Sequence, residues 1–80
     1  DILITHGPPF GKLDANVNSY RTGCEDLLKT VDKIKPKYHI FGHIHEAYGM
    51  TYNEHTTFIN ASILDEHYHI KNKPVLIEYD

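Results

Sequence analysis

Two short apolar runs, at residues 2–5 and 38–41, enclose one segment of helical periodicity, and this order limits the possible folds more than any other feature of the chain. Each run is rich in β-branched or aromatic residues and is closed by a turn-forming glycine, Gly7 or Gly42. Between the runs, apolar residues recur at helical spacing over residues 24–34. A strand, a helix and a strand in this order predict a βαβ unit, whose two strands are parallel and whose crossover is right-handed.

The predicted helix carries acidic residues at its start and basic residues at its end. Glu25 and Asp26 fall in the first turn and Lys33 in the last, as the helix dipole favours, and Pro36 ends the segment. The stretch before the helix, residues 10–22, is polar and rich in turn-forming residues, so it is expected to be a surface loop.

After the second predicted strand the chain changes character. Four short runs with β propensity follow, separated by turn residues, at residues 47–52, 56–59, 67–70 and 75–79. These runs predict hairpins or a meander that adds to the βαβ unit. No shift in composition marks a boundary between domains, so residues 1–80 are interpreted as part of a single α/β domain.

Charge, cysteine content and length exclude several classes of protein. The chain has 80 residues, a formal net charge of -3 and scattered lysines, which argues against nucleic acid as a bulk partner. A single cysteine, Cys24, excludes an internal disulfide framework and a cysteine-rich zinc site. No apolar run approaches the ~20 residues that span a bilayer, so we expect no membrane association and a cytoplasmic location. The chain also opens at Asp1 and enters an apolar run at once, which is typical of a fragment that begins inside a domain.

Three of the seven histidines follow the two predicted parallel strands. His6 comes after the first strand, and His43 and His45 come after the second, so all three are expected at the carboxyl edge of the sheet, where α/β proteins bind ligands. Neutral imidazole is the commonest protein ligand for transition metals. Gly42 would allow the backbone to turn sharply at the end of the strand. Glu46 could orient a metal-binding imidazole by accepting a hydrogen bond from the ring nitrogen that does not bind the metal.

A structural interpretation competes with the metal interpretation. A lone histidine at the end of a strand is more often a hydrogen-bonded structural residue than a ligand, and two histidines separated by one residue are weak evidence alone. What favours a metal site is that His6 and the pair His43 and His45 occur at one edge of a single βαβ unit. A second such pair, His67 and His69, lies in a predicted strand and is interpreted as structural, and His39 is interpreted as a satisfied core histidine.

Two segments carry a resemblance to a known family. Thr-His-Gly-Pro-Pro at residues 5–9 and Phe-Gly-His-Ile-His-Glu at residues 41–46 resemble the last two sequence blocks of the calcineurin-like metallophosphoesterase superfamily. With Gly-Cys at 23–24 and Ile-Asn-Ala-Ser at 59–62, the chain is similar to the metallophosphoesterase-domain-containing protein subgroup, which resembles class III cyclic-nucleotide phosphodiesterases. Some members of that subgroup carry glycine in place of His43, and the histidine of this chain favours competence.

The resemblance implies a fold and a metal centre. The fold would be two β-sheets packed face to face with helices outside, of which residues 1–80 would be the C-terminal portion. Two divalent ions, Mn, Fe, Zn or Mg, would activate water to hydrolyse a small phosphodiester, with cyclic nucleotides as one candidate. His6 and His43 would ligate one ion and His45 the other.

The family's earlier blocks, Asp-x-His, Gly-Asp and Gly-Asn-His, do not occur in this chain. We therefore assign no catalytic residue here and expect the missing N-terminal half of the domain as a partner, with the isolated chain inactive. The main alternative is a non-catalytic truncated remnant that binds a metal or a partner. A histidine-rich metal buffer is less favoured, because the histidines lie at strand ends rather than in a tract.

Overall fold

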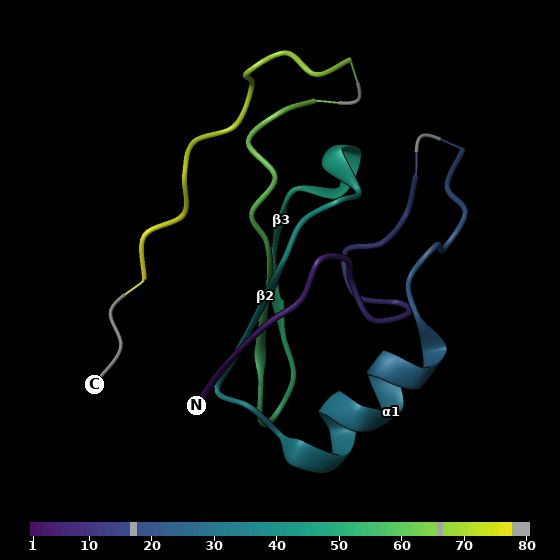
Figure 1. The fold of residues 1–80 in the computed structure, drawn as a ribbon, viewed down its shortest axis with the longest axis vertical. Helices are drawn as coiled ribbons and strands as arrows, with labels where there is room; N and C mark the ends of the chain where they lie inside the picture. Colours follow the sequence, from purple (N-terminus) through teal and green to yellow (C-terminus); the bar gives the residue numbers. More distant parts are fainter. Residues whose placement is uncertain (17, 66, 78–80) are drawn as a thin grey trace.

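A computed structural model describes residues 1–16, 18–65 and 67–77. Its elements form one layer of sheet with a helix on one side and irregular segments at the sheet's carboxyl edge (Figure 1). In chain order they are β1 (Ile2–Ile4), α1 (Glu25–Ile34), β2 (Tyr38–Phe41), a 3-10 turn η1 (His45–Ala47), β3 (Gly49–Tyr52) and β4 (Thr57–Asn60).

The described strands form a mixed four-stranded sheet in the order β1-β2-β4-β3. β1 pairs with β2 in parallel, with Ile4 opposite Ile40, which confirms the predicted βαβ unit. β3 and β4 form the predicted antiparallel hairpin, with Met50 opposite Ile59. The hairpin joins the sheet through β4, which pairs with β2 in parallel. Three parallel strands therefore end at the same edge.

Two expectations for the last third of the chain are wrong. Residues 67–70 form no strand; the local pairing is an isolated antiparallel bridge between Leu64 and Ile70. The reason is a tight turn in which the Asp65 carboxylate accepts hydrogen bonds from the backbone, an alternative to strand pairing that aspartate readily offers. Residues 75–77 are likewise not a strand, and the rest of the 75–79 run lies outside the described residues. The second sheet of a sandwich is not among the described elements, so the sandwich stays a prediction.

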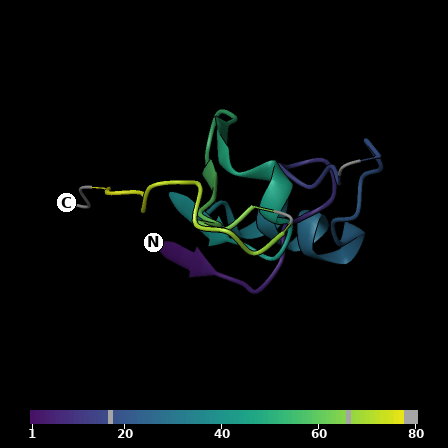
Figure 2. The ribbon, with the colours of Figure 1, turned by 90° about the horizontal axis from the view of Figure 1, so that it is seen from above.

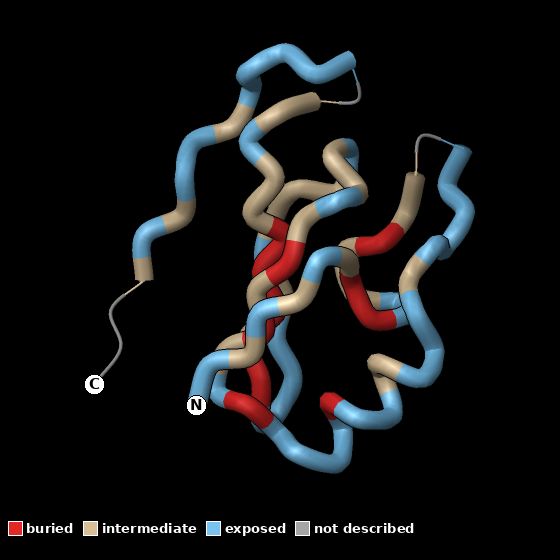
Figure 3. Tube along the Cα trace, viewed as in Figure 1, coloured by how far each residue is buried: buried red, intermediate tan, exposed pale blue. Residues whose placement is uncertain are grey.

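The core lies between one face of the sheet and α1. Val31, Phe41 and Phe58 are buried, and partly buried leucines pack around them: Leu3, Leu13 and Leu27. Buried residues lie along the middle strands of the sheet, and α1 contributes one buried residue, Val31 (Figure 3). After residue 70 the chain runs back along the sheet on the side away from α1 (Figures 1 and 2).

The opposite face of the sheet is open along its two outer strands, β1 and β3, whereas Ile59 in the middle of that face is buried. Ile2 and Ile4 of β1 are 43% and 73% exposed, and Met50 and Tyr52 of β3 are 55% and 78% exposed. The strand register places all four on the face opposite Leu3 and Phe58. The single helix covers the other face, so the outer strands β1 and β3 present apolar side chains to solvent in the described part of the chain.

α1 begins and ends where the charge pattern predicts. The Sγ atom of Cys24 accepts a hydrogen bond from the Leu27 N–H at the N-terminus, and Lys35 ends the helix in a left-handed conformation with φ 49°. Cys24 itself is exposed, so its role here is to cap the helix rather than to pack in the core. No helix in the described part of the chain has the length and apolar character needed to cross a membrane.

His39 lies in the core of the sheet, and among the described residues only one of its two ring nitrogens has a hydrogen-bond partner. Its ring lies edge-on to Phe41 and Phe58, with centroids 5.0 and 5.8 Å away. Its Nε2 donates to Thr5 Oγ1 at 2.9 Å, because the Thr5 hydroxyl is itself a donor to the Gly7 carbonyl at 2.7 Å. Nδ1 is buried without a partner among the described residues. Burial lowers the pKa of His39 from 6.5 to about 4, so the folded chain holds a neutral imidazole here.

We expect the free energy of unfolding to fall as the pH drops from about 6.5 toward 4. The unfolded chain protonates His39 in this interval and the folded chain does not, so the stabilisation is complete above 6.5 and is lost on acidification. Urea unfolding across this interval measures the slope. His39→Leu should flatten it, whereas the control His55→Leu, at an exposed turn residue, should keep it. Equal slopes for His39→Leu and the parent would contradict the assignment.

Candidate metal centre

The carboxyl ends of β1 and β2 are joined beyond the strands by backbone hydrogen bonds. The Thr5 N–H donates to the Ile40 carbonyl at 3.0 Å, and the Gly42 N–H donates to the His6 carbonyl at 3.1 Å. Parallel pairing thus continues past the end of each strand. As a result, the residues that follow β1 and β2 leave the sheet side by side.

His6 and His43 come together at this edge. Their ring centroids lie 4.6 Å apart, with the ring planes inclined at 42°. This separation brings two imidazoles, the side chain that transition metals bind most often in proteins, next to each other. Two imidazoles alone do not complete a coordination shell.

A strained turn directs His43. The Ile44 N–H donates to the Gly42 carbonyl at 2.8 Å, which closes a three-residue turn centred on His43, whose φ is 67°. Turns of this kind with positive φ are rare, and a left-handed conformation costs a residue with a Cβ about 1–2 kcal/mol. Strain of this type clusters at functional sites. The sharp turn expected at Gly42 is thus made by His43 itself.

Gly42 serves a different purpose from the one expected. A Cβ atom at this position would lie 3.3 Å from Ser62 Oγ, closer than most side-chain contacts. The missing side chain therefore lets the segment after β4 approach the segment after β2. The Ser62 hydroxyl is buried there without a partner among the described residues.

His45 points to other partners than His6 and His43. Its Nδ1 lies 3.1 Å from the Asp65 carbonyl oxygen, and its ring meets the Tyr68 ring edge-on, with centroids 5.1 Å apart. A carbonyl can only accept, so Nδ1 carries the proton and Nε2 keeps its lone pair. In residues 1–16, 18–65 and 67–77, no group of three or more histidine, cysteine or acidic side chains is arranged to hold a metal ion. The structure brings two of the predicted ligands together and leaves the third apart.

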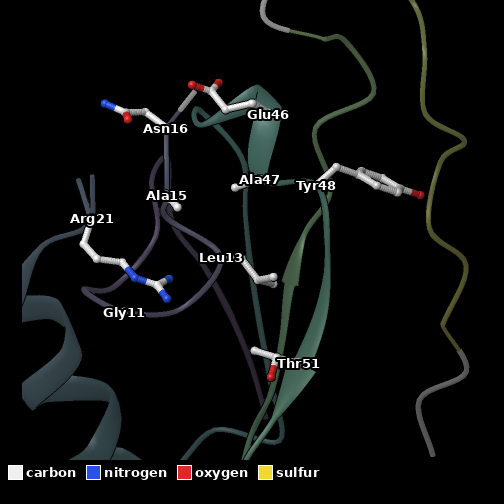
Figure 4. Close-up of a pocket in the computed structure, with 9 residues that line it drawn as sticks. All are labelled: Gly11, Leu13, Ala15, Asn16, Arg21, Glu46, Ala47, Tyr48 and Thr51. Carbon is white, nitrogen blue, oxygen red and sulfur yellow. The ribbon is translucent and has the colours of Figure 1, made fainter. Parts of the chain in front are cut away.

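Glu46, expected behind a ligand imidazole, lies on the wall of two hollows. The hydrogen-bond partner of His45 Nδ1 is the Asp65 carbonyl, and the role of Glu46 stays a prediction. The larger hollow, about 510 Å³, lies between the loop before α1 and the segment from η1 into β3 (Figure 4). In that view Tyr48 turns away from the hollow, and its hydroxyl donates to the Lys73 carbonyl at 2.7 Å.

Asn60, at the end of β4, ties together three segments around this edge. It is fully buried, and its amide nitrogen donates to the Ile44 carbonyl at 2.8 Å and to the Leu13 carbonyl at 3.2 Å. Its amide oxygen accepts from the Ser62 N–H at 3.1 Å. The sequence singled out this stretch only through the family resemblance. One feature of the sequence could have indicated the role of Asn60: an asparagine at the end of an apolar strand. If its amide is buried, it must form hydrogen bonds with neighbouring loops.

Asp14 holds the long loop in place. Its carboxylate is fully buried and accepts from the Gly11 and Gly23 N–H groups, each at 2.9 Å, and from Arg21 Nη1 at 3.0 Å. Burial alone would raise the pKa of Asp14, but these hydrogen bonds and the Arg21 charge together hold that pKa below its ordinary value. Within the described part of this loop, an ionised carboxylate therefore holds Gly11, Arg21 and Gly23 together.

Comparison with known proteins gives consistent relatives. No protein-family model matches the chain. It is 49% identical over 79 residues to one UPF0046 protein of Caenorhabditis elegans and 50% identical over 76 residues to another, with 98% and 95% of this chain covered. It is 48% identical over 80 residues to human metallophosphoesterase domain-containing protein 1, again with 98% of this chain covered. The chain spans only 20%, 26% and 24% of the length of these three relatives.

The turn at His43 generates a test that separates backbone strain from ligand loss. His43→Gly and His43→Ala both remove the imidazole, but glycine adopts a positive φ without a steric penalty. We therefore expect the His43→Gly protein to be more stable than the His43→Ala protein by about 1 kcal/mol in urea unfolding.

The same pair of substitutions at His55 provides the control, because the φ of His55 is not positive. There alanine should be the more stable of the two, since glycine loses more conformational freedom on folding. If alanine were also the more stable residue at position 43, the strained turn would not exist in solution.

Proposed function

We propose that the chain forms part of a dinuclear metal phosphoesterase that hydrolyses phosphodiester bonds. The observation that carries this proposal is the pairing of His6 and His43 at the carboxyl edge of parallel strands, with ring centroids 4.6 Å apart. Support comes from the similarity to metallophosphoesterase domain-containing protein 1, a name that describes that relative and suggests the chemistry of this chain.

The three histidines have distinct roles in this proposal. His6 and His43 would hold one divalent ion, and Nε2 of His45 would hold a second. Such ions would supply positive charge to the phosphoryl oxygens and lower the pKa of a water molecule. Imidazole ligands favour transition metals over Mg, which leaves Mn, Fe and Zn as the better candidates.

Neutral imidazoles alone do not balance the charge of two divalent ions. The carboxylate ligands would come from outside the matched region, which is only 26% and 24% of the length of two of the relatives. The open apolar face of the sheet favours this view, because Ile4, Met50 and Tyr52 offer a surface on which further chain could pack. The substrate in this proposal is a small phosphodiester.

The direct test is hydrolysis of bis(p-nitrophenyl) phosphate by the full-length protein with Mn²⁺. Mutating a residue that hydrogen-bonds to a metal ligand typically lowers activity by about 10–100-fold. We expect His6→Ala and His43→Ala, which remove a ligand itself, each to lower kcat/KM by at least that factor. Because both side chains would serve one ion, the double variant should be little worse than either single variant. His55→Ala is the exposed control and should keep parental activity. Parental activity in His43→Ala at saturating metal would sink the mechanism.

The isolated 80-residue chain generates a separate expectation. It should show no turnover with added Mn²⁺, and it should associate, because an apolar sheet face and the edge strand β1 are open to other chains. Turnover assays and light scattering measure the two properties. Robust turnover from a monomer would show that residues 1–80 are a complete catalytic domain.

A further inference from the structure

We propose that Asp65 is a positioning residue for His45, and that the hydrogen bonds of Asp65 with His67, Tyr68 and His69 set which ring nitrogen of His45 is available to a metal. This inference rests on the proposed function for its purpose, since it concerns the role of His45 as a ligand. Its geometric part is independent of any metal.

The turn is organised by both ends of Asp65. The carboxylate oxygen Oδ1 accepts from the His67 and His69 N–H groups, at 2.9 and 3.0 Å. On the main chain, the Asp65 N–H donates to the His69 carbonyl at 2.8 Å, and the Asp65 carbonyl accepts from the Tyr68 N–H at 3.0 Å. Five hydrogen bonds thus meet at this one residue when the His45 contact is included. The position of the Asp65 carbonyl is therefore defined by the turn that the Asp65 side chain closes.

That carbonyl selects the tautomer of His45. It lies 3.1 Å from Nδ1 and can only accept, so the proton of the neutral ring stays on Nδ1. Nε2 is then the nitrogen with a free lone pair, the form in which histidine binds a metal. Histidines that bind metals commonly donate their other ring N–H to a carbonyl or carboxylate, which fixes the ring and raises its basicity.

Tyr68 restrains the same ring from a second direction. Its φ is 64°, and its ring stands almost perpendicular to that of His45, at an interplanar angle of 82°. Together the carbonyl of Asp65 and the ring of Tyr68 define both the rotation and the tilt of the imidazole. Both groups come from one turn, 20 or more residues after His45.

Core packing does not account for the order of this turn. His67, Tyr68, His69 and Ile70 are all exposed, with Tyr68 73% and Ile70 82% accessible. Ordering exposed backbone costs conformational entropy that no burial offsets here. Asp65 and Tyr68 nevertheless both contact the ring of His45, which is what a positioning role requires.

The test is the tautomer of His45 in the metal-free full-length protein, read from long-range ¹H–¹⁵N correlation spectra of ¹⁵N-histidine-labelled samples. The parent should show a proton on Nδ1 and none on Nε2. Asp65→Ala should give a mixture of the two tautomers, because the carbonyl loses its defined position. Asp65→Asn keeps an acceptor oxygen for both amides and should restore the parental spectrum. Asp32→Ala, which removes an exposed acid on α1, is the charge-matched control and should change nothing.

Zinc titration of the same variants separates this inference from the proposed function. Asp65→Ala should weaken zinc binding by about 10–100-fold, with Asp65→Asn close to the parent. An unchanged tautomer in Asp65→Ala, or a parental proton on Nε2, would overturn the positioning role whatever the affinity. A shifted tautomer with unchanged zinc affinity would overturn the role of His45 as a ligand. If Asp65→Ala does not fold, Asp65→Ser, which shortens the acceptor, replaces it in both measurements.

Discussion

Parallel pairing of β1 with β2 is the constraint on which the site depends. Because parallel strands end at the same edge, and because the Gly42 N–H still bonds to the His6 carbonyl beyond the strands, the two exit segments leave the sheet together. The helix between the strands packs against one face of the sheet, where Val31 joins Phe41 and Phe58 in the buried core. His6 and His43 are neighbours as a consequence of backbone pairing, before any metal is considered.

Around this backbone frame, buried polar groups hold the loops that the site requires. Asn60 links the ends of three segments, and Asp14 organises the long loop before α1. The energy stored in the left-handed turn at His43 is tolerated because its neighbours are tied down on both sides. The strained turn at His43 and the hydrogen bonds of Asn60 and Asp14 are thus two parts of one arrangement.

Local sequence patterns predicted the elements whose hydrophobic period is clear: β1, α1, β2 and the β3–β4 hairpin. They did not predict that β4 would insert beside β2, because the choice of partner depends on long-range packing rather than on local propensity. They also failed at residues 67–70, where the side chain of Asp65 overrides β propensity. The convergence of His6 and His43 follows from topology, whereas the direction of His45 depends on a carbonyl 20 residues away that no local pattern reveals.

The central claim is that His6 and His43 bind one and the same ion, and anomalous X-ray diffraction from zinc-loaded crystals of the full-length protein tests it most directly. The account predicts an anomalous peak about 2.0–2.1 Å from a ring nitrogen of each of the two histidines. A second peak is expected about 3.5–4 Å from the first, at Nε2 of His45. Zinc bound only elsewhere, for instance at His67 and His69, with none between His6 and His43, would contradict the claim.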